Sequence, residues 1–594
     1  MQPPAIRAAQ ALISEFIAQG LRDIVLAPGS RSAPLAYAAM QAARAGLVRL
    51  HVRIDERSAA FLALGIANGD RALHPEEAKI IPPVALITTS GTAVANTFPA
   101  IMEASHSGLP LLILSADRPT YYHLAGANQA TDQSGIFAKH TRLEIDLPLP
   151  QGIENELDVV RNLAVRSYHA ASGSRSHRPG PVHLNIPYQE PLTPNEPLAR
   201  DHLYKSPLPG KPKVHVSLKP VPARGVPFSE YSLGQFPVVI AGTGAPKQAT
   251  VVAWRQQAPL IAEVTSGLAA GENWVKASSL ILEASQVTKA EFIDPITDII
   301  VYGRPTLDRG VNNLLNHPSA RLWIVDTNPE NWFDAGAGGH QVLVQTPEAW
   351  TNQKITPTET AQWLKQWQVM SKKASRAVEK TINSDLKSAP KSFGAYRMIS
   401  TLAKTLSPSD VLVVGPSNPV RDLDLLASWE HSPVIVTNRG LAGIDGMIST
   451  AIGVSLATRR DGSRAVQRVV RALVGDLTFL HDVGGLLRGP YESEVQLQII
   501  VINDNGGSIF AGIEHGRQGD EETFERVFAT PHGVSLGEVC SGYGVGHQLI
   551  RTQEELKAAL QNPLDTVSVL EVIVPRDDRE FAHQHLLQQV KKIS

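Results

Sequence analysis

Short apolar strands alternate with amphipathic helices along most of this chain. The alternation occupies residues 1–190, 236–350 and, after a mainly helical stretch, the region up to the C-terminus. Strands that are apolar on both faces and separated by helices are typical of parallel sheets with helices on either side. A chain of 594 residues also exceeds what one hydrophobic core usually holds. We therefore expect an α/β protein with three doubly wound domains.

Composition suggests where the domains end. Residues 191–235 are rich in proline and lack apolar periodicity, which predicts a long surface linker. The expected division is an α/β domain, this linker, a central α/β domain and a C-terminal α/β domain, at residues 1–190, 191–235, 236–390 and 391–594.

The first and last domains carry the same succession of motifs. The stretch DIVLAPGSRSAPLA matches VLVVGPSNPVRDLD, with a strand, a glycine-proline turn, a serine, an arginine and a helix in each. A strand, a polar turn and a helix of small residues then follow in both, and a further strand and turn after them. Duplicated domains of this kind usually face each other across a shared site. A chance alignment of two common α/β domains is the alternative.

Charge, cysteine content and hydropathy narrow the functional class. The net charge is −2, so no strong field would attract nucleic acid or an anionic membrane. Cys540 is the only cysteine, which excludes an internal disulfide and a cysteine-based metal cluster. The N-terminal residues lack the apolar core of a signal peptide, and no apolar run is long enough to cross a bilayer. We expect a cytoplasmic protein without stable membrane insertion.

Two aspartates near the C-terminus follow consecutive predicted strands. Asp476 and Asp504 are 504 − 476 = 28 residues apart, which is one helix and one strand. Parallel strands bring such positions to the same edge of a sheet. Asp476, Asp504 and the Gly506 carbonyl could bind Mg²⁺ or Mn²⁺, with diphosphate oxygens completing the shell. The amides of the helix that starts at Leu477 and Thr478, with the glycines at 506 and 507, suit the diphosphate. Alternatively, the two aspartates are ordinary helix caps.

A single carboxylate lies more than 400 residues away from this pair. Glu56 follows an apolar strand and precedes a helix of small apolar residues, so apolar surroundings should raise its pKa. Thiamine diphosphate requires such a carboxyl group, which contacts its aminopyrimidine ring, and a separate metal-diphosphate site. The alternative is that Asp55, Glu56 and Arg57 form an ordinary charge cluster at a helix N-terminus.

With these motifs the chain resembles the thiamine-diphosphate-dependent enzymes, whose signature is GDG…NN. Leu477 departs from the third position of that signature. Within the superfamily the chain is similar to the carboligases of menaquinone and phylloquinone biosynthesis. The motifs that carry this closer similarity are APGSRSAPL, DERSAAFLALGIA, TSGTAVAN, SADRP, GANQA, TNRGLAGIDG, GDLTFLHD and NDNGGSIF.

The resemblance implies that the first domain binds the cofactor's pyrimidine and the last its diphosphate. Glu56 would contact the pyrimidine, and Ile444 would support the bent cofactor. The implied reaction is decarboxylation of 2-oxoglutarate, then addition of the succinyl unit to isochorismate. The resemblance further implies a homodimer, or a dimer of dimers, in which Glu56 of one chain serves the cofactor held by its partner.

Both substrates are dicarboxylates, which arginine binds best. Four arginines follow apolar strands in glycine- or proline-marked turns, although any one of them could be a surface ion pair: Arg31, Arg118, Arg421 and Arg439. The family usually places two adjacent basic residues at one position of the central domain. This chain has Leu307-Asp308-Arg309 at that position, so only Arg309 supplies a cation. The other expected substrate contacts are polar or apolar neutral side chains: Ser30, Gln129, Ser417, Ile509 and Phe510.

Other readings remain open. A related carboligase that acts on pyruvate, similar to acetolactate synthase, would not need so many cations. A non-catalytic homologue would have no use for Glu56 or Asp476. The AGTGAP stretch at 241–246 resembles a dinucleotide loop but lacks the third glycine, so NAD or FAD binding is disfavoured. His583 and His585 are expected on a polar helix face.

Overall fold

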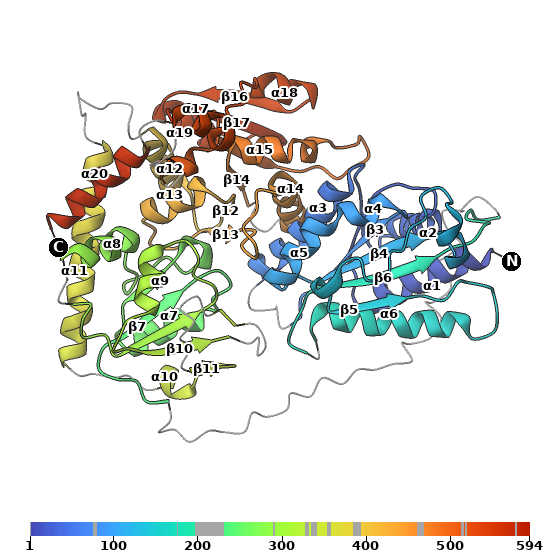
Figure 1. Cartoon of the computed structure of the whole chain (residues 1–594), viewed down its shortest axis with the longest axis horizontal. Helices are drawn as coiled ribbons and strands as arrows, with labels where there is room; N and C mark the ends of the chain where they lie inside the picture. The colour runs from blue at the N-terminus through green and yellow to red at the C-terminus, as the bar shows by residue number, and fades with distance from the viewer. Residues whose placement is uncertain are drawn as a thin grey trace. The chain divides into compact units, whose positions relative to one another are not determined.

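The structure is a computed structural model (Figure 1). It describes residues 2–74, 80–174, 176–195, 231–288, 292–326, 332–333, 341–352, 358–383, 394–459, 468–512, 516, 520–576 and 579–593. Most of the predicted linker, residues 196–230, lies outside the described residues.

The described residues belong to two compact units. The first unit takes its residues from Met1–Val221, Asn438–Ala465 and Thr478–Leu497. The second takes its residues from Pro222–Thr437, Val466–Leu477 and Gln498–Ser594.

The first of three parallel sheets has the strand order β2-β1-β3-β4-β6-β5. Its central strands are buried along their whole length, as expected for strands with helices on both faces. The strands are β1 (Asp23–Leu26), β2 (Arg49–Val52), β3 (Val84–Thr88), β4 (Leu111–Asp117), β5 (Leu143–Asp146) and β6 (Pro181–Pro187).

Helices cover both faces of this sheet (Figure 1). Helix α1 packs against α2 and α6 on one side, where Leu12, Phe16 and Leu35 join the core, and α3 packs against α5. The helices are α1 (Pro4–Gln19), α2 (Ala33–Arg44), α3 (Glu56–Leu73), α4 (Thr92–Asn96), α5 (Phe98–Ser107) and α6 (Glu156–Ser172).

The second sheet has the order β11-β10-β9-β7-β8. Its strands are β7 (Pro237–Ala241), β8 (Leu260–Ala262), β9 (Asp298–Tyr302), β10 (Arg321–Val325) and β11 (Gln341–Leu343). The helices of this part of the chain are α7 (Gln248–Arg255), α8 (Ser278–Thr288), α9 (Arg309–Leu315), α10 (Glu348–Asn352) and α11 (Thr358–Asn383).

The third sheet has the order β13-β12-β14-β15-β17-β16. Its strands are β12 (Val411–Val414), β13 (Val434–Val436), β14 (Val470–Gly475), β15 (Leu497–Asn503), β16 (Gly546–Ile550) and β17 (Val567–Ile573). The helices here are α12 (Gly394–Thr405), α13 (Asn418–Leu426), α14 (Met447–Thr458), α15 (Asp476–His481), α17 (Glu521–Thr523), α18 (Leu536–Gly542), α19 (Gln553–Gln561) and α20 (Arg579–Lys591).

The first and third sheets repeat one topology. If each sheet is numbered from its own first strand, both have the order 2-1-3-4-6-5. The motif pairs matched in the sequence occupy equivalent strands, since β1 corresponds to β12, β2 to β13 and β3 to β14. The predicted duplication is therefore a property of the fold, and so is the doubly wound α/β class.

Equivalent helices of the two copies, α3 and α14, pack directly against each other within the first unit. Glycines allow this close approach. A Cβ atom on Gly65 would lie 2.2 Å from the Thr450 carbonyl oxygen, and one on Gly453 would lie 2.4 Å from the Leu62 carbonyl oxygen. Every residue of α14 from Met447 to Ala457 is buried, which explains why this helix has no polar face.

None of the helices within the described ranges combines the length and the apolar character that a membrane span requires.

Candidate active site

Asp476 and the glycine loop after β15 lie together, as the spacing predicts. Strands β14 and β15 are neighbours, with Gly475 aligned to Ile502. Asp476 is 2% exposed. Its Oδ1 accepts a 2.7 Å hydrogen bond from the Leu477 amide, and its Oδ2 accepts a 2.8 Å bond from the Gly506 amide. The Asp476 carboxylate thus contacts its own turn and a residue 30 positions later, at the end of the sheet.

The glycines of this loop allow it to pack closely against the Ala529 carbonyl. Gly506 has a φ of +142°, and a Cβ atom there would lie 2.3 Å from the Ala529 carbonyl oxygen. The Gly507 amide donates to that same oxygen at 2.6 Å. The amides of Gly506, Gly507 and Leu477 therefore already have acceptors within the chain. Their predicted role as diphosphate donors would require them to exchange these partners.

Sequence reasoning missed His532. Its Nε2 lies 3.2 Å from Asp476 Oδ2, and its amide donates to the side-chain oxygen of Asn505. No spacing rule singles out a histidine 56 residues after the aspartate. Its effect is to add a neutral or positive group beside the buried carboxylate.

The donor set fits a hard cation only in part. Asp476 is buried and Asp504 is half-buried, and these two carboxylates and the Gly506 carbonyl are the ligands that the sequence predicts. Among the described residues, no group of three or more histidine, cysteine, aspartate or glutamate side chains could hold a metal. Two carboxylates and a carbonyl leave an octahedral shell incomplete, so oxygens from a bound diphosphate would have to fill it.

Glu56 is the first residue of α3 and is half-buried. Asp55 caps the helix by accepting from the amides of Arg57 and Ser58, and Arg57 donates to the His481 carbonyl oxygen at 2.8 Å. Within the part of the chain that the structure describes, the Glu56 carboxylate has no hydrogen-bond or ion-pair partner. Among Asp55, Glu56 and Arg57, therefore, only Glu56 has a charged group that is available for a ligand.

Asp482 is a second residue that sequence reasoning missed. It is buried, and it accepts from the amide and hydroxyl of Ser449 at 2.7 and 3.1 Å and lies 3.4 Å from the Ser58 hydroxyl. Burial raises the pKa of its carboxyl group to about 6. Asp482 therefore connects α14 to the start of α3, two residues from Glu56.

We expect the free energy of unfolding to depend less on pH in the Asp482→Asn variant than in the parent. The folded protein keeps the Asp482 proton up to about pH 6, whereas the unfolded chain releases it near 3.8. Stability therefore falls as pH rises through this window, by about 3 kcal/mol in total. The parent should lose Tm relative to the variant between pH 4 and 7. An identical pH dependence of Tm in both proteins would show that Asp482 is ionised throughout.

The loop between β13 and α14 carries the predicted residues Arg439 and Ile444, both half-buried. Glu103 on α5 holds this loop: its two carboxylate oxygens accept from the amides of Gly440 and Leu441, each at 2.7 Å. Glu103 is 4% exposed and also accepts from the Ser107 hydroxyl. Nothing in the sequence links Glu103 to a loop more than 330 residues away.

The predicted polar residues of the first domain lie after the C-terminal ends of β1 and β4, as expected. Arg31 is 7% exposed and donates to the Tyr188 carbonyl oxygen at 2.8 Å, with an ion pair to Glu190 at 2.9 Å. The Arg118 guanidinium lies 5.7 Å from the ring centroid of Tyr122. Its Nε is buried and has no hydrogen-bond partner among the described residues. Arg31 is thus committed to the fold, and Arg118 retains a donor.

The neutral residues predicted beside them occupy the same edge of the sheet. Ser30 and Gln129 are both exposed. The Gln129 carbonyl oxygen accepts from the Ser90 hydroxyl at 2.8 Å, which places this loop next to the end of β3. Gln129 has a φ of +51°, a backbone conformation that the Ser90 contact helps to hold.

The second unit contains a cavity of about 620 Å³ that brings together three predicted substrate residues, Arg309, Arg421 and Ile509. Arg421 donates to the Leu307 carbonyl oxygen. Burial raises the pKa of Asp308, which also lines the cavity, to about 6. The cavity therefore combines two arginines, of which Arg421 is held by a backbone carbonyl, with four acidic residues: Glu283, Asp308, Asp422 and Asp424.

Two further predicted residues lie close to this cavity along the chain. Ser417 precedes α13 with a φ of +73°, and the next residue, Asn418, donates to the Ser508 hydroxyl at 2.7 Å. Phe510 is half-buried, with its ring centroid 5.8 Å from that of Phe528. Neither Ser417 nor Phe510 lines the cavity itself.

Exchange of Arg421 for lysine should not be silent. Lysine cannot bond the Leu307 carbonyl and a carboxylate with one planar fork. We expect kcat/KM for 2-oxoglutarate to fall about 30- to 150-fold, since about 2–3 kcal/mol of charge-assisted bonding is at stake. Arg397→Lys is the matched control, because Arg397 donates to the Ile382 carbonyl and does not line the cavity. Equal losses in both variants would indicate a folding effect alone.

The remaining motifs have partners within the protein, and His583 with its partner Glu283 also lines the cavity of about 620 Å³. In the dinucleotide-like stretch, a Cβ atom on Gly242 would lie 2.1 Å from the backbone of Arg304 and Pro305, so this loop is closed by its own chain. His583 lies 3.0 Å from Glu283 across the packed helices α20 and α8.

Comparison with known families agrees with the two cofactor halves. Residues 6–136 match the family described as thiamine pyrophosphate enzyme, N-terminal TPP binding domain. Residues 425–572 match thiamine pyrophosphate enzyme, C-terminal TPP binding domain.

Curated relatives are similar over almost the whole chain. A protein from Renibacterium salmoninarum is 38% identical, over 98% of this chain and 96% of its own length. A protein from Mycobacterium marinum is 39% identical, over 98% of each chain. Both are named 2-succinyl-5-enolpyruvyl-6-hydroxy-3-cyclohexene-1-carboxylate synthase.

A solved structure supports the fold. The benzoylformate decarboxylase from Polynucleobacter necessarius superimposes with a TM-score of 0.62, over 96% of this chain and 99% of its own. Its sequence identity is 16%, so this similarity concerns the architecture.

Proposed function

This chain belongs to the family of 2-succinyl-5-enolpyruvyl-6-hydroxy-3-cyclohexene-1-carboxylate synthases, and on that premise we propose how its residues perform the reaction. It is a thiamine-diphosphate-dependent transferase of menaquinone biosynthesis. It decarboxylates 2-oxoglutarate and transfers the remaining succinyl unit to isochorismate, with release of CO₂.

Glu56 is the proposed catalytic residue. Thiamine diphosphate, when bound, supplies a carbon acid whose deprotonation depends on a carboxyl group at its pyrimidine ring. The carboxylate of Glu56 can take this role because Asp55 and Arg57 have partners, whereas Glu56 has none among the residues that the structure describes. Glu56 lies one turn before the buried residues Ala59 and Ala60, at the start of the apolar helix α3.

The other half of the proposed site holds the diphosphate and its metal. Asp476, Asp504 and the Gly506 carbonyl would hold Mg²⁺ or Mn²⁺. What supports this is the buried Asp476 carboxylate, which contacts two backbone amides and an imidazole. Leu477, Thr478 and Gly507 would line the diphosphate, and Ile444 would support the thiazolium.

The substrate carboxylates are assigned to the arginines. Arg309 and Arg421 are the strongest candidates, because they line one cavity in the described chain. Arg118 follows, since its buried Nε retains a donor. Arg439 and Arg31 complete the proposal, and Arg31 would bind substrate with the donors that Tyr188 and Glu190 do not use. Ser30, Gln129, Ser417, Ile509 and Phe510 would supply neutral contacts.

The test is a two-substrate assay on the purified protein. With thiamine diphosphate and Mg²⁺ present, we expect CO₂ release from 2-oxoglutarate coupled to consumption of isochorismate. A chelator should abolish both, and Mg²⁺ or Mn²⁺ with cofactor should restore them. Equal use of pyruvate as the donor would support the acetolactate-synthase-like alternative. No turnover of either acid by the cofactor-loaded protein would support a non-catalytic homologue.

We also propose a homodimer, or a dimer of dimers, with active sites shared between chains, in the cytoplasm. The duplicated copies motivate this arrangement. The alternative is an active site built entirely within one chain. The bond from Arg57 to the His481 carbonyl favours this alternative, because it joins the two copies within the first unit.

Co-expression distinguishes these two assemblies. Glu56→Gln and Asp476→Ala should each be nearly inactive as homodimers. In a mixed dimer with shared sites, one site carries both defects and the other carries neither, so about half of the parent activity per dimer should return. The measurement is kcat of doubly tagged, purified heterodimers. Heterodimers as inactive as their parents would show that each site is built within one chain.

A further inference from the structure

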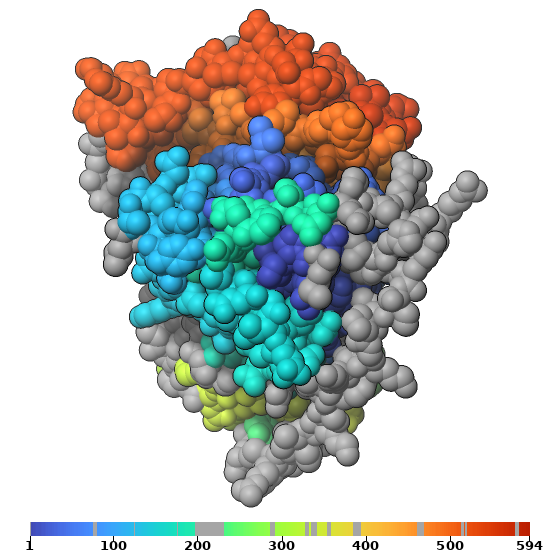
Figure 2. Space-filling view, turned by 90° about the vertical axis from the view of Figure 1, so that its right-hand side faces the viewer, coloured from blue at the N-terminus to red at the C-terminus, as the bar shows by residue number. Residues whose placement is uncertain are grey.

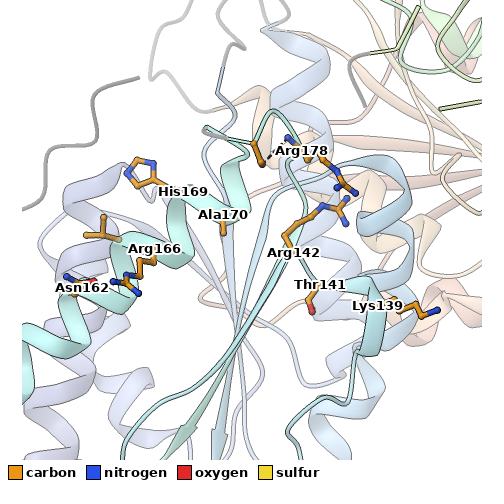
Figure 3. A pocket seen from close by; sticks show the side chains of 10 residues that line it. Lys139, Thr141, Arg142, Asn162, Arg166, His169, Ala170 and Arg178 are labelled. Atoms are coloured by element: carbon orange, nitrogen blue, oxygen red, sulfur yellow. Dashed lines mark hydrogen bonds between the residues drawn. The ribbon is translucent and has the colours of Figure 1, made fainter. Parts of the chain in front are cut away.

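A basic pocket of about 700 Å³ lies in the first unit. Figure 3 shows the residues that line it. Lys139, Thr141 and Arg142 come just before β5, and Arg178 comes just before β6. The pocket therefore opens at the N-terminal ends of these strands. The proposed catalytic residues of this sheet follow its C-terminal ends, at the opposite edge.

The lining is strongly cationic. It includes Lys139, Arg142, Arg166 and Arg178, with His169 beside them, and none of the ten lining residues is an aspartate or a glutamate. Four permanent charges that line one pocket repel one another. An anion bound among these cations would reduce the repulsion between them.

One cation is already fixed in position. Arg142 donates to the Ser105 carbonyl and hydroxyl oxygens at 2.8 and 3.1 Å and to the Pro179 carbonyl at 3.2 Å. A Cβ atom on Gly180 would lie 2.6 Å from its Nε, so only glycine leaves this room. Burial, and next the charge of Arg178, lower the pKa of Arg142. A guanidinium held this way is preorganised and loses little entropy on binding.

The opposite wall comes from one side of α6. Asn162, Arg166 and His169 are three to four residues apart, which places them on one helix face. Asn162 and Arg166 are exposed, and the surface of this part of the unit is visible in the space-filling view (Figure 2). In Figure 3 they lie on the helix across from Arg142 and Arg178. The pocket thus has a rigid wall and a wall of adaptable side chains.

From this arrangement we propose that the pocket binds a small organic anion with two or more negative charges, carried by phosphoryl or carboxylate oxygens. Both groups match the planar fork of arginine. A cavity of this size is in the range of small-molecule sites. Such a site would be separate from Glu56, because Glu56 follows the C-terminal end of a strand of this sheet and the pocket lies at the N-terminal ends.

Titration calorimetry on the holoenzyme tests this proposal, with thiamine diphosphate and Mg²⁺ saturating. The probes are inorganic phosphate and propane-1,2,3-tricarboxylate. The test variant is Lys139→Gln with Arg166→Gln, since both side chains are exposed. Arg161→Gln is the matched control, because Arg161 is on the same helix, pairs with Asp158 and does not line the pocket.

We expect saturable binding of at least one probe to the parent and to Arg161→Gln, with a Kd about 10- to 100-fold weaker in the double variant. Phosphate alone binding in this way would assign a phosphoryl ligand, and the tricarboxylate alone a carboxylate ligand. The absence of saturable binding would overturn the proposal. So would the same Kd in all three proteins, because the anion would then occupy another site.

Discussion

The Glu56→Gln variant is expected to bind thiamine diphosphate and Mg²⁺ nearly as the parent does, but to lose at least about 100-fold in kcat. A glutamine keeps the size of the side chain and removes the proton that a carboxyl group can share with the pyrimidine ring. Positioned acid–base groups typically contribute 10²- to 10⁴-fold to the rate. The measurement is kcat for CO₂ release from 2-oxoglutarate, with the cofactor Kd determined in parallel.

A helix-capping role for Glu56 makes a different prediction, because loss of a first-turn carboxylate should cost only about 0.3–1 kcal/mol of stability. Glu554→Gln is the matched control, since Glu554 is an exposed glutamate in the first turn of α19. A similar small loss of Tm in both variants with unchanged kcat would rule out the catalytic assignment. A selective loss of kcat in Glu56→Gln would establish it.

The Asp476→Ala variant is expected to lose metal-dependent cofactor binding. The change removes a charged oxygen from the proposed metal site and also frees the Gly506 amide that this carboxylate holds at 2.8 Å. We expect the Kd of thiamine diphosphate with Mg²⁺ to rise at least about 100-fold and to become insensitive to a chelator, because a hard cation depends on anionic oxygen ligands.

Asp476→Asn separates the two effects. An asparagine side chain keeps an oxygen that can accept from the Gly506 amide, but it carries no charge. If the carboxylate binds metal, this variant should be nearly as defective as Asp476→Ala, and bound Mn²⁺ measured by electron paramagnetic resonance should fall below one ion per site. Parent-like Mn²⁺ binding in Asp476→Asn would mean that the carboxylate only shapes the loop.

Local patterns in the sequence were sufficient for the architecture. Strands such as β4 and β15 are apolar runs because both faces of a parallel sheet are covered, and this requirement is visible in a single segment. The duplication was visible for the same reason, since each copy repeats its strands and turns in order. The adjacency of Asp476 and Gly506 followed from the neighbouring positions of consecutive parallel strands.

The tertiary structure alone decided which side chains hold these elements in place. Glu103 bonds amides more than 330 residues away, Asp482 bonds both Ser449 and Ser58, and His532 lies beside Asp476. Arg31 was predicted as a substrate ligand, yet its guanidinium is engaged by Tyr188 and Glu190. Such contacts join a side chain to a distant backbone group, and they depend on the relative placement of elements that no local pattern encodes. The sequence by itself therefore determined the sheets and the residues at their ends, whereas packing determined which of those residues remain available for chemistry.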